Sequence, residues 1–181
     1  YNPVIYELSK ENKELIPKTI KHIFIISDRR ERIETLRKIA KAVNSDKTMI
    51  FINTKYDLEE SLQKLQYHNY NVAALAGNID KQSKKKAVED FQNGRLQYLL
   101  ATDVAARGLQ IDHVSTVINV NLPEEPTEYL HRAGRCGRNN EQGLCISIIT
   151  ENELNKIKKY QKAFNINIVQ KRLYNGKIVS K

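Results

Sequence analysis

Short apolar runs alternate along this chain with longer amphipathic stretches, and this alternation constrains the fold more than any other feature. From His22 onward the apolar runs are rich in Ile, Val, Phe or Leu, as strands buried on both faces are; they cover residues 22–27, 48–53, 71–75, 97–101, 115–120 and 144–149. Stretches with apolar residues at helical spacing lie between them, at about 30–43, 56–68, 80–93, 126–135 and 151–164. This order predicts an α/β fold of three layers, doubly wound around a mostly parallel sheet.

The length of 181 residues suits one domain of this class. We expect residues 22–165 to form it. Residues 1–21 are polar and contain two prolines, which is typical of a linker or an extended lead-in, and residues 166–181 are expected to add a final strand and a basic tail. Since the first residue is Tyr1 rather than Met, we also expect the chain to be cut from a longer polypeptide.

Charge and cysteine content narrow the class of partner. Lys and Arg number 30 against 21 Asp and Glu, a formal net charge of +9 that favours nucleic acid or an anionic membrane, although an inert basic surface fits equally well. The sequence has no apolar run of the roughly 20 residues that cross a bilayer and no secretory signal pattern. Cys136 and Cys145 form no CxxC pair and have no histidine at metal-ligand spacing, so we predict no metal site and a reducing, cytoplasmic location.

Three of the predicted strands end in residues that suit a phosphate. Ligands of open parallel sheets bind beyond the carboxyl ends of the strands. Thr54, Gly77 and Thr102 follow such ends, and Asp103 comes next. Hydroxyl and backbone N–H groups there could together follow a nucleic-acid backbone without reading its bases. The alternative for each residue is an ordinary helix cap.

Lysines crowd the first turns of the helix expected after Gly77: Lys81, Lys84, Lys85 and Lys86. Cations are unfavourable at a helix N-terminus, because the helix dipole is already positive there. This position therefore favours a bound anion, and the alternative is a solvated lysine face.

The segment HRAGRCGR is the strongest local feature. On an ideal helix His131, Arg135 and Arg138 would share one face. Arginines that converge repel one another unless an anion lies between them, and guanidinium groups match the oxygens of a triphosphate. The alternative is a surface pair of arginines bridged to Glu124 or Glu128.

Four segments resemble the motifs of DEAD-box ATP-dependent RNA helicases. Residues 50–54 resemble motif IV, and residues 75–77 with the lysine-rich helix resemble motif IVa. Residues 101–109 are similar to motif V, and residues 131–138 are similar to motif VI. The order and separations match the second, C-terminal core domain of that family, which has a RecA-like fold, and the resemblance covers roughly residues 20–165.

The resemblance implies a role for each matched residue. Arg135 and Arg138 would be arginine fingers that reach the γ-phosphate of ATP, and Gly108 and Gln110 would lie against the nucleotide. The residues that would hold RNA phosphates are Thr54, Gly77, Lys81, Lys84 and Thr102. His131 and Arg107 would act at the boundary between the two core domains, with Arg107 supporting motif V through an ion pair.

Three positions depart from the family pattern. Lys81 and Lys84 stand where the family usually has Gln and Arg, which keeps a cation near the phosphates but loses the guanidinium fork. Ala76 replaces a common His. Gln110 replaces an Asp that touches the nucleotide sugar, and an uncharged, longer side chain makes that contact less secure.

The sequence contains no GxxxxGK[ST] phosphate loop and no Asp-Glu-Ala-Asp box. The resemblance places both in an N-terminal RecA-like domain of the same polypeptide, which would hold most of the ATP and its Mg²⁺. We therefore expect this chain to be inactive as an ATPase by itself and to need that domain and RNA as partners. Alternatives are a non-catalytic phosphate-binding module that anchors RNA, and a helicase acting on DNA; a dinucleotide-binding enzyme would need a GxGxxG turn that is absent.

Overall fold

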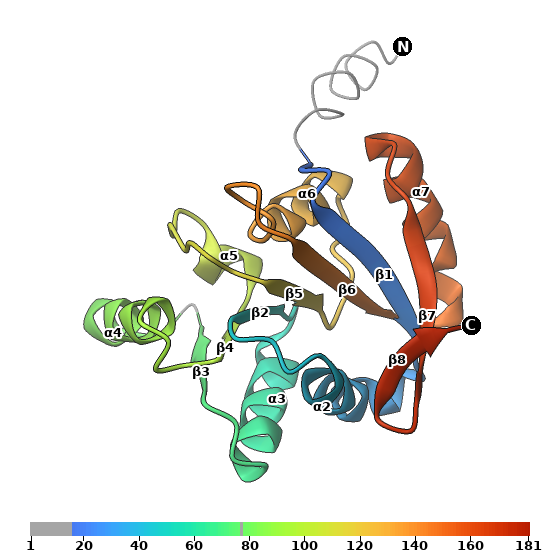
Figure 1. Ribbon diagram of the computed structural model, residues 1–181. Helices are drawn as coiled ribbons and strands as arrows, with labels where there is room; N and C mark the ends of the chain where they lie inside the picture. The colour runs from blue at the N-terminus through green and yellow to red at the C-terminus, as the bar shows by residue number, and fades with distance from the viewer. Residues whose placement is uncertain (1–15, 77) are drawn as a thin grey trace.

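The computed structural model describes residues 16–76 and 78–181, which form a sheet of eight strands (Figure 1). The strands are β1 Ile20–Ile26, β2 Thr48–Phe51, β3 Val72–Leu75, β4 Tyr98–Ala101, β5 Thr116–Asn119, β6 Gly143–Ile149, β7 Ile168–Tyr174 and β8 Lys177–Ser180. Their order in the sheet is β3-β4-β2-β5-β6-β1-β7-β8, and only the pair β7–β8 is antiparallel.

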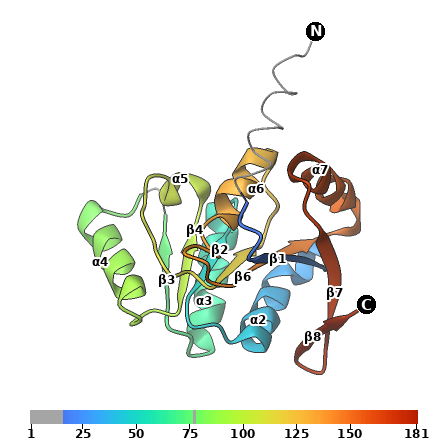
Figure 2. The same cartoon turned by 45° about the horizontal axis from the view of Figure 1, so that its top comes forward.

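Helices cover both faces of the sheet, so the three-layer prediction is confirmed. On one face α2 (Arg32–Val43) and α3 (Lys55–Tyr67) bury side chains such as Leu36 and Leu58. The opposite face carries α4 Lys81–Gln92, α5 Asp103–Ala106, α6 Pro126–Ala133 and α7 Leu154–Phe164. Figure 2 shows the sheet between the two sets of helices. Short 3-10 helices, η2 Arg29–Glu31 and η3 Glu151–Glu153, precede α2 and α7.

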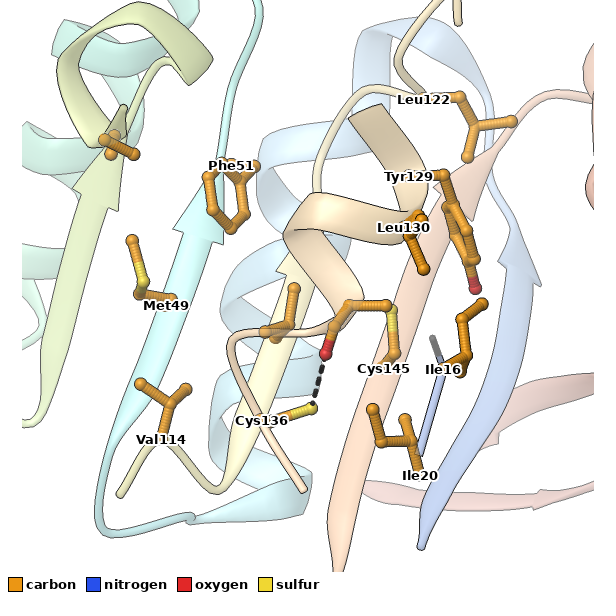
Figure 3. Packing of buried hydrophobic residues seen from close by; sticks show 14 of the residues in the cluster. Ile16, Ile20, Met49, Phe51, Val114, Leu122, Tyr129, Leu130, Cys136 and Cys145 are labelled. Atoms are coloured by element: carbon orange, nitrogen blue, oxygen red, sulfur yellow. Dashed lines mark hydrogen bonds between the residues drawn. The ribbon is translucent and has the colours of Figure 1, made fainter. Parts of the chain in front are cut away.

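Helix α6 is fixed by aromatic packing on the second face. Tyr129 is fully buried, and its ring stacks on that of Tyr160 in α7 with centroids 4.8 Å apart. Figure 3 shows Tyr129 and Leu130 pointing from α6 toward β6 and β1, beside Cys145. This contact holds the amino half of the HRAGRCGR segment firmly against the sheet.

The two ends of the chain differ from expectation in detail. Residues 1–15 of the expected lead-in lie outside the described residues; Ile16 is buried in the core, and β1 already begins at Ile20. The C-terminal residues form two strands rather than one strand and a tail. Asn175 and Gly176, with φ of 47° and 71°, make the tight turn between β7 and β8, because a two-residue hairpin loop of this kind needs positive φ at both positions.

Parallel strands bring the predicted site residues to one edge. Phe51 pairs with Ala101 of β4 on one side and with Asn119 of β5 on the other, so these three strands end level. The residues that follow them are therefore neighbours, although they lie up to about 70 positions apart in the sequence. No helix in the described ranges is long and apolar enough to cross a membrane.

Candidate nucleotide and nucleic-acid site

Arg132, which is only 1% exposed, lies at the centre of the sheet edge formed by the carboxyl ends of the strands. Its Nε and one terminal nitrogen donate to the two carboxylate oxygens of Asp103, at 2.7 and 2.5 Å. The same terminal nitrogen, Nη2, also donates to Asn53 Oδ1 at 2.8 Å. The other terminal nitrogen, Nη1, donates to the carbonyl oxygen of Asn121 at 2.7 Å and to Asn119 Oδ1 at 3.3 Å. All five N–H donors of the guanidinium group are thereby satisfied.

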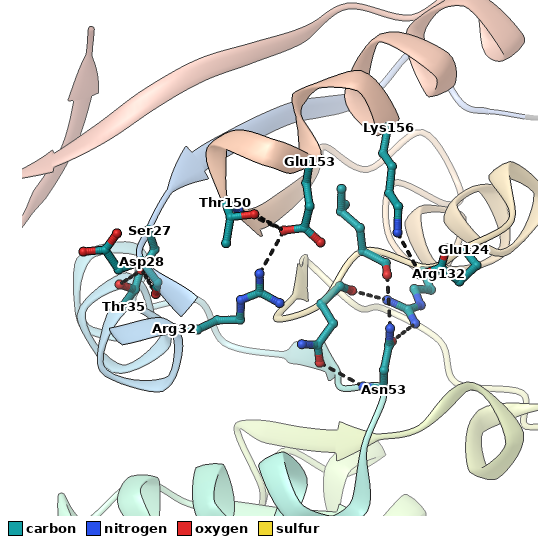
Figure 4. A network of polar contacts seen from close by, with 12 residues as sticks. Ser27, Asp28, Arg32, Thr35, Asn53, Glu124, Arg132, Thr150, Glu153 and Lys156 are labelled. Carbon is teal, nitrogen blue, oxygen red and sulfur yellow. Dashed lines mark hydrogen bonds and ion pairs between the residues drawn. The ribbon is translucent and has the colours of Figure 1, made fainter. Parts of the chain in front are cut away.

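This network ties α6 to the ends of β2, β4 and β5. The Arg132 guanidinium also lies over the ring of Phe51, 5.2 Å from its centroid. Figure 4 shows the contact between Arg132 and Asn53 from this side. Sequence reasoning missed Arg132, although a signal was present: it lies three positions after the buried Tyr129, on the buried face of its helix.

The predicted common helical face of His131, Arg135 and Arg138 is wrong, because α6 ends at Ala133. After Ala133 the backbone N–H groups of Arg135 and Cys136 donate to the carbonyl oxygens of Arg132 and Ala133, three residues back, so the chain leaves the helix in tight turns. Gly137, with a φ of +66°, then adopts a left-handed conformation that no α-helix contains. A Cβ on Gly137 would come within 2.5 Å of Ile20 Cγ1, so glycine lets the chain pass this close to β1.

Arg135 turns back onto the segment after α5. Its guanidinium group donates to the carbonyl oxygen of Leu109 and, at 3.1 Å, to that of Ala106. Burial lowers the pKa of Arg135, and the charge of Arg138 lowers it further. Arg138 is exposed, and its Nε donates to the carbonyl oxygen of Gly134 at 2.8 Å. Two positive groups therefore lie near each other, with no carboxylate within 4 Å of either among residues 16–76 and 78–181.

The carboxylates named as alternative partners are engaged elsewhere. Glu128 lies 3.7 Å from Arg107, so Arg107 does form an ion pair beside motif V, although its side chain is 73% exposed. Glu124 lies 2.8 Å from Lys156, whose hydrogen bond and charge lower the pKa of this glutamate. The structure thus gives no support to a surface pair bridging the arginines.

A small hollow of about 90 Å³ opens beside these groups, lined by Phe51, Asp103, Ala106, Arg107, Gly108, Glu128, His131, Arg132 and Arg135. It brings together four of the predicted nucleotide-side and interdomain residues. Ligand pockets usually measure about 300–1,000 Å³, so this hollow suits only part of a nucleotide. Gly108 has a φ of +75° and open space where a side chain would stand, which leaves its backbone accessible.

Arg138 and Gln110 do not line this hollow. Gln110 is exposed, and its backbone carbonyl accepts a hydrogen bond from Gln92 Nε2 at 2.9 Å. A larger hollow of about 760 Å³ lies at the opposite, amino edge of the sheet, between the residues before β1 and the start of β7. None of the predicted site residues lines that hollow.

Thr54 and Thr102 both cap helices, which is the alternative role that the sequence left open for them. Thr54 Oγ1 accepts from the backbone N–H of Asp57 at 3.1 Å, and Thr102 Oγ1 accepts from that of Ala105 at 3.3 Å. Capping uses the oxygen as an acceptor and leaves the hydroxyl proton to donate. A cap at this edge can therefore also donate to a phosphate.

The predicted lysines lie in α4, which follows β3, the strand next to β4 in the sheet. Asp80 caps α4 by accepting from the N–H of Ser83 at 2.9 Å, and hydrogen bonds from Ser83 lower the pKa of this carboxylate. Lys81 and Lys84 have no carboxylate within 4 Å in the described part of the chain, whereas Lys85 lies 3.8 Å from Glu89.

The described RNA-side residues thus follow three adjacent strands in the order β3, β4, β2. Gly77, predicted to belong to the same set, lies outside the described residues.

Known proteins match this arrangement in sequence. A family model described as the helicase conserved C-terminal domain matches residues 31–140. The DEAD-box ATP-dependent RNA helicase CshC of Bacillus cereus is 34% identical over 169 residues, which cover 93% of this chain and 42% of that protein. The probable ATP-dependent RNA helicase YfmL of Bacillus subtilis is 32% identical over 162 residues, covering 90% and 43%. The chain thus spans less than half the length of these relatives.

Solved structures match it as well. The C-terminal domain of the DEAD-box protein Dbp5 superposes with a TM-score of 0.80 at 29% identity, covering 85% of this chain and 91% of that domain. Dbp5 of S. cerevisiae bound to RNA and ADP BeF3 gives a TM-score of 0.82 at 28% identity, covering 89% of this chain and 44% of the other.

Proposed function

Because the chain belongs to the DEAD-box RNA helicases and forms their C-terminal core domain, we propose that it supplies half of an ATP site and half of an RNA path. The observation that carries this proposal is the common edge of the sheet. Arg135 and Arg107 line a hollow too small for a nucleotide, and Thr54 and Thr102 follow strands at that same edge. A second RecA-like domain facing this edge completes both sites.

Arg135 and Arg138 are the proposed arginine fingers. Burial disfavours the charge on Arg135, and Arg138 stands near it, so an anion between them relieves both effects. The γ-phosphate of ATP is that anion. In phosphoryl transfer such a finger contributes about 10³–10⁵ in rate by stabilising charge in the transition state. Gly108, with its accessible backbone, and the more distant Gln110 are proposed to lie along the nucleotide.

ATP, with Mg²⁺ held by the facing domain, supplies the phosphoryl group whose cleavage drives the cycle. His131 is exposed at the rim of the hollow, where it can contact that domain, and Arg107 lies beside it, held loosely by Glu128. We assign both to the interdomain boundary.

The RNA path follows the ends of β3, β4 and β2. Thr54 and Thr102 donate hydroxyl protons to phosphates, and Lys81 and Lys84 add charge; Gly77 belongs to the same path. These contacts reach only the backbone, so binding is independent of sequence and weakens with salt. Domain closure that bends the bound strand then separates a duplex locally.

The proposed site of action is the cytoplasm. Both cysteines are buried as free thiols, which is compatible with a reducing compartment.

The test compares ATP turnover of this chain alone and joined to an N-terminal DEAD-box core domain, with and without RNA. We expect turnover only in the joined form, stimulated by RNA. Arg138→Ala in the joined protein should lower kcat about 10³-fold or more while RNA crosslinking to this domain persists. Arg95→Ala is the matched control, since Arg95 is an exposed arginine paired with Asp90 away from the site. Near-normal turnover of the Arg138 variant would sink the finger assignment.

A further inference from the structure

The positive charge of the protein is concentrated at one end of the sheet. Residues 154–181, which form α7, β7 and β8, contain eight Lys and Arg and no Asp or Glu. The whole chain has 30 Lys and Arg and 21 Asp and Glu, so the other 153 residues hold 22 and 21 and are nearly neutral. The C-terminal elements thus contribute 8 of the 9 units of net charge, and the other 153 residues together contribute one.

The β7–β8 hairpin presents part of this charge on a single face. Ile168 packs into the cluster beneath α7, whereas Leu173 packs against the cluster beneath α2. Successive residues of a strand point to opposite faces, so Arg172 and Tyr174 lie on the same side as Ile168, toward α7. Tyr174 pairs with Lys177 across the turn, which places Lys177 on that side too.

Lys181 completes the group, because its Nζ lies 3.4 Å from Oε1 of Gln170 on the same face. We call Arg172, Tyr174, Lys177 and Lys181 the hairpin face.

The hairpin face combines an exposed aromatic ring with cations. Tyr174 is 56% exposed, and the guanidinium group of Arg172 lies 5.2 Å from the centroid of its ring. Arg172, Lys177 and Lys181 are exposed and have no carboxylate within 4 Å in the described ranges. An aromatic ring for a base and nearby cations for the phosphates are what proteins use to bind single strands.

Other polyanions fit this face less well. Insertion into a membrane needs an exposed apolar helix face, but α7 buries Ile157, Tyr160 and Phe164 in the core, so only the electrostatic attraction of the lysines to anionic headgroups is left. A paired duplex does not offer the face of a base to an aromatic side chain, so Tyr174 favours an unpaired strand.

The hairpin face is separate from the proposed RNA path. Five strand-to-strand steps separate β4, which leads to Thr102, from β7. At about 4.8 Å a step the two surfaces lie roughly 24 Å apart along the sheet.

We propose that the hairpin face is a second binding site for single-stranded RNA, outside the cleft between the core domains. The choice of RNA rests on the proposed function; the site itself rests on the placement of Tyr174, Arg172 and the two lysines. One base stacks on Tyr174 and Arg172, and Lys177 and Lys181 hold flanking phosphates. The site retains one strand of the substrate while the cleft opens and closes.

Fluorescence anisotropy of the full chain tests this, with a labelled uridine oligonucleotide of about 12 nucleotides, within the ~4–16 that one such surface covers. Stacking on one aromatic side chain changes affinity about 5-fold or more. We expect the double variant R172Q/Y174A to raise Kd by at least that factor. Y67A/R95Q makes the same chemical changes at two exposed residues toward the amino edge and should leave Kd unchanged.

A third variant, K81Q/K84Q, separates this proposal from the proposed function. Additive losses in the hairpin and α4 variants support two surfaces. If K81Q/K84Q loses affinity while R172Q/Y174A keeps the wild-type Kd, the hairpin face is refuted and the RNA path is supported. The reverse result refutes the RNA path alone. If neither variant weakens binding, both are refuted.

Crosslinking gives an independent readout. A 4-thiouridine oligonucleotide should attach to the tryptic peptide of residues 173–177, which contains Tyr174 and follows cleavage after Arg172. Crosslinks confined to other peptides count against the site. Since Tyr174 is exposed, its variant should melt at the wild-type temperature, so a lost crosslink is not a folding effect.

Discussion

Replacing Asp103 with Asn should destabilise the protein far more than its place at the rim of a site suggests. Asp103 holds Arg132 through two charge-assisted hydrogen bonds of 2.5 and 2.7 Å, and Arg132 is 1% exposed. Asparagine has nearly the same shape but no charge, so the guanidinium group would remain buried without a counter-ion. Removing one partner of a buried ion pair costs about 3–5 kcal/mol. The Asp103 side chain is itself 27% exposed, so water replaces part of the loss and the lower figure applies.

Urea unfolding followed by circular dichroism measures this cost as a change in the free energy of unfolding at constant m-value. Arg107→Gln is the control, since that exposed pair with Glu128 at 3.7 Å is worth about 1 kcal/mol or less. A double-mutant cycle with Arg132→Met should give a coupling energy of about 1–3 kcal/mol. If Asp103→Asn loses less than about 1 kcal/mol, the network does not hold the edge together and this reasoning is refuted.

Two further predictions concern folding. Burial lowers the pKa of His22 from 6.5 to about 4, so the unfolded chain binds the proton more tightly than the folded one. The contribution of the neutral His22 to the free energy of unfolding is therefore fully present above pH 6.5. It is lost, by up to about 3 kcal/mol, as the pH drops to 4. Thermal melts from pH 7 to 4 should show this fall, and His22→Leu should flatten it. Gly137→Ala should cost more than Gly94→Ala in urea unfolding, since both positions have positive φ but only Gly137 meets Ile20 at 2.5 Å. Equal costs would show that the contact with Ile20 yields easily.

The sequence predicted the elements well because each carries its own local signal. Buried parallel strands are continuous apolar runs and helices repeat every 3.6 residues, so the ends of the predicted elements shifted by no more than three residues. The meeting of Thr54 and Thr102 at one edge also followed, since parallel strands share an edge. The Asn175-Gly176 turn was readable too, as a hairpin signal between two strands, yet the second strand was missed.

What sequence reasoning missed depends on contacts between distant segments. The five acceptor atoms around Arg132 belong to four residues, at positions 53, 103, 119 and 121, and nothing local shows that these residues converge. The helix was extended too far because the chain after Ala133 goes into i→i+3 turns, and Gly137 then packs against Ile20, 117 positions away. For the same reason, sequence spacing placed Arg135 and Arg138 on one helical face with His131, whereas in the structure both arginines lie beyond the end of α6.

The hydrogen bonds of Arg132 and Arg135 link the proposed RNA path to the proposed ATP site. Arg132 donates hydrogen bonds to Asp103, and Arg135 donates to the carbonyl oxygens of Ala106 and Leu109, so these bonds tie the segment beginning at Thr102 to α6 and to the turn that follows it. We therefore expect a ligand that shifts Thr102 to alter the energy of placing Arg135, and the converse. In the proposed enzyme, RNA therefore changes the affinity for ATP by the same factor by which ATP changes the affinity for RNA, because coupling free energies are reciprocal. Weakening either tether should uncouple the two ligands without abolishing the binding of either.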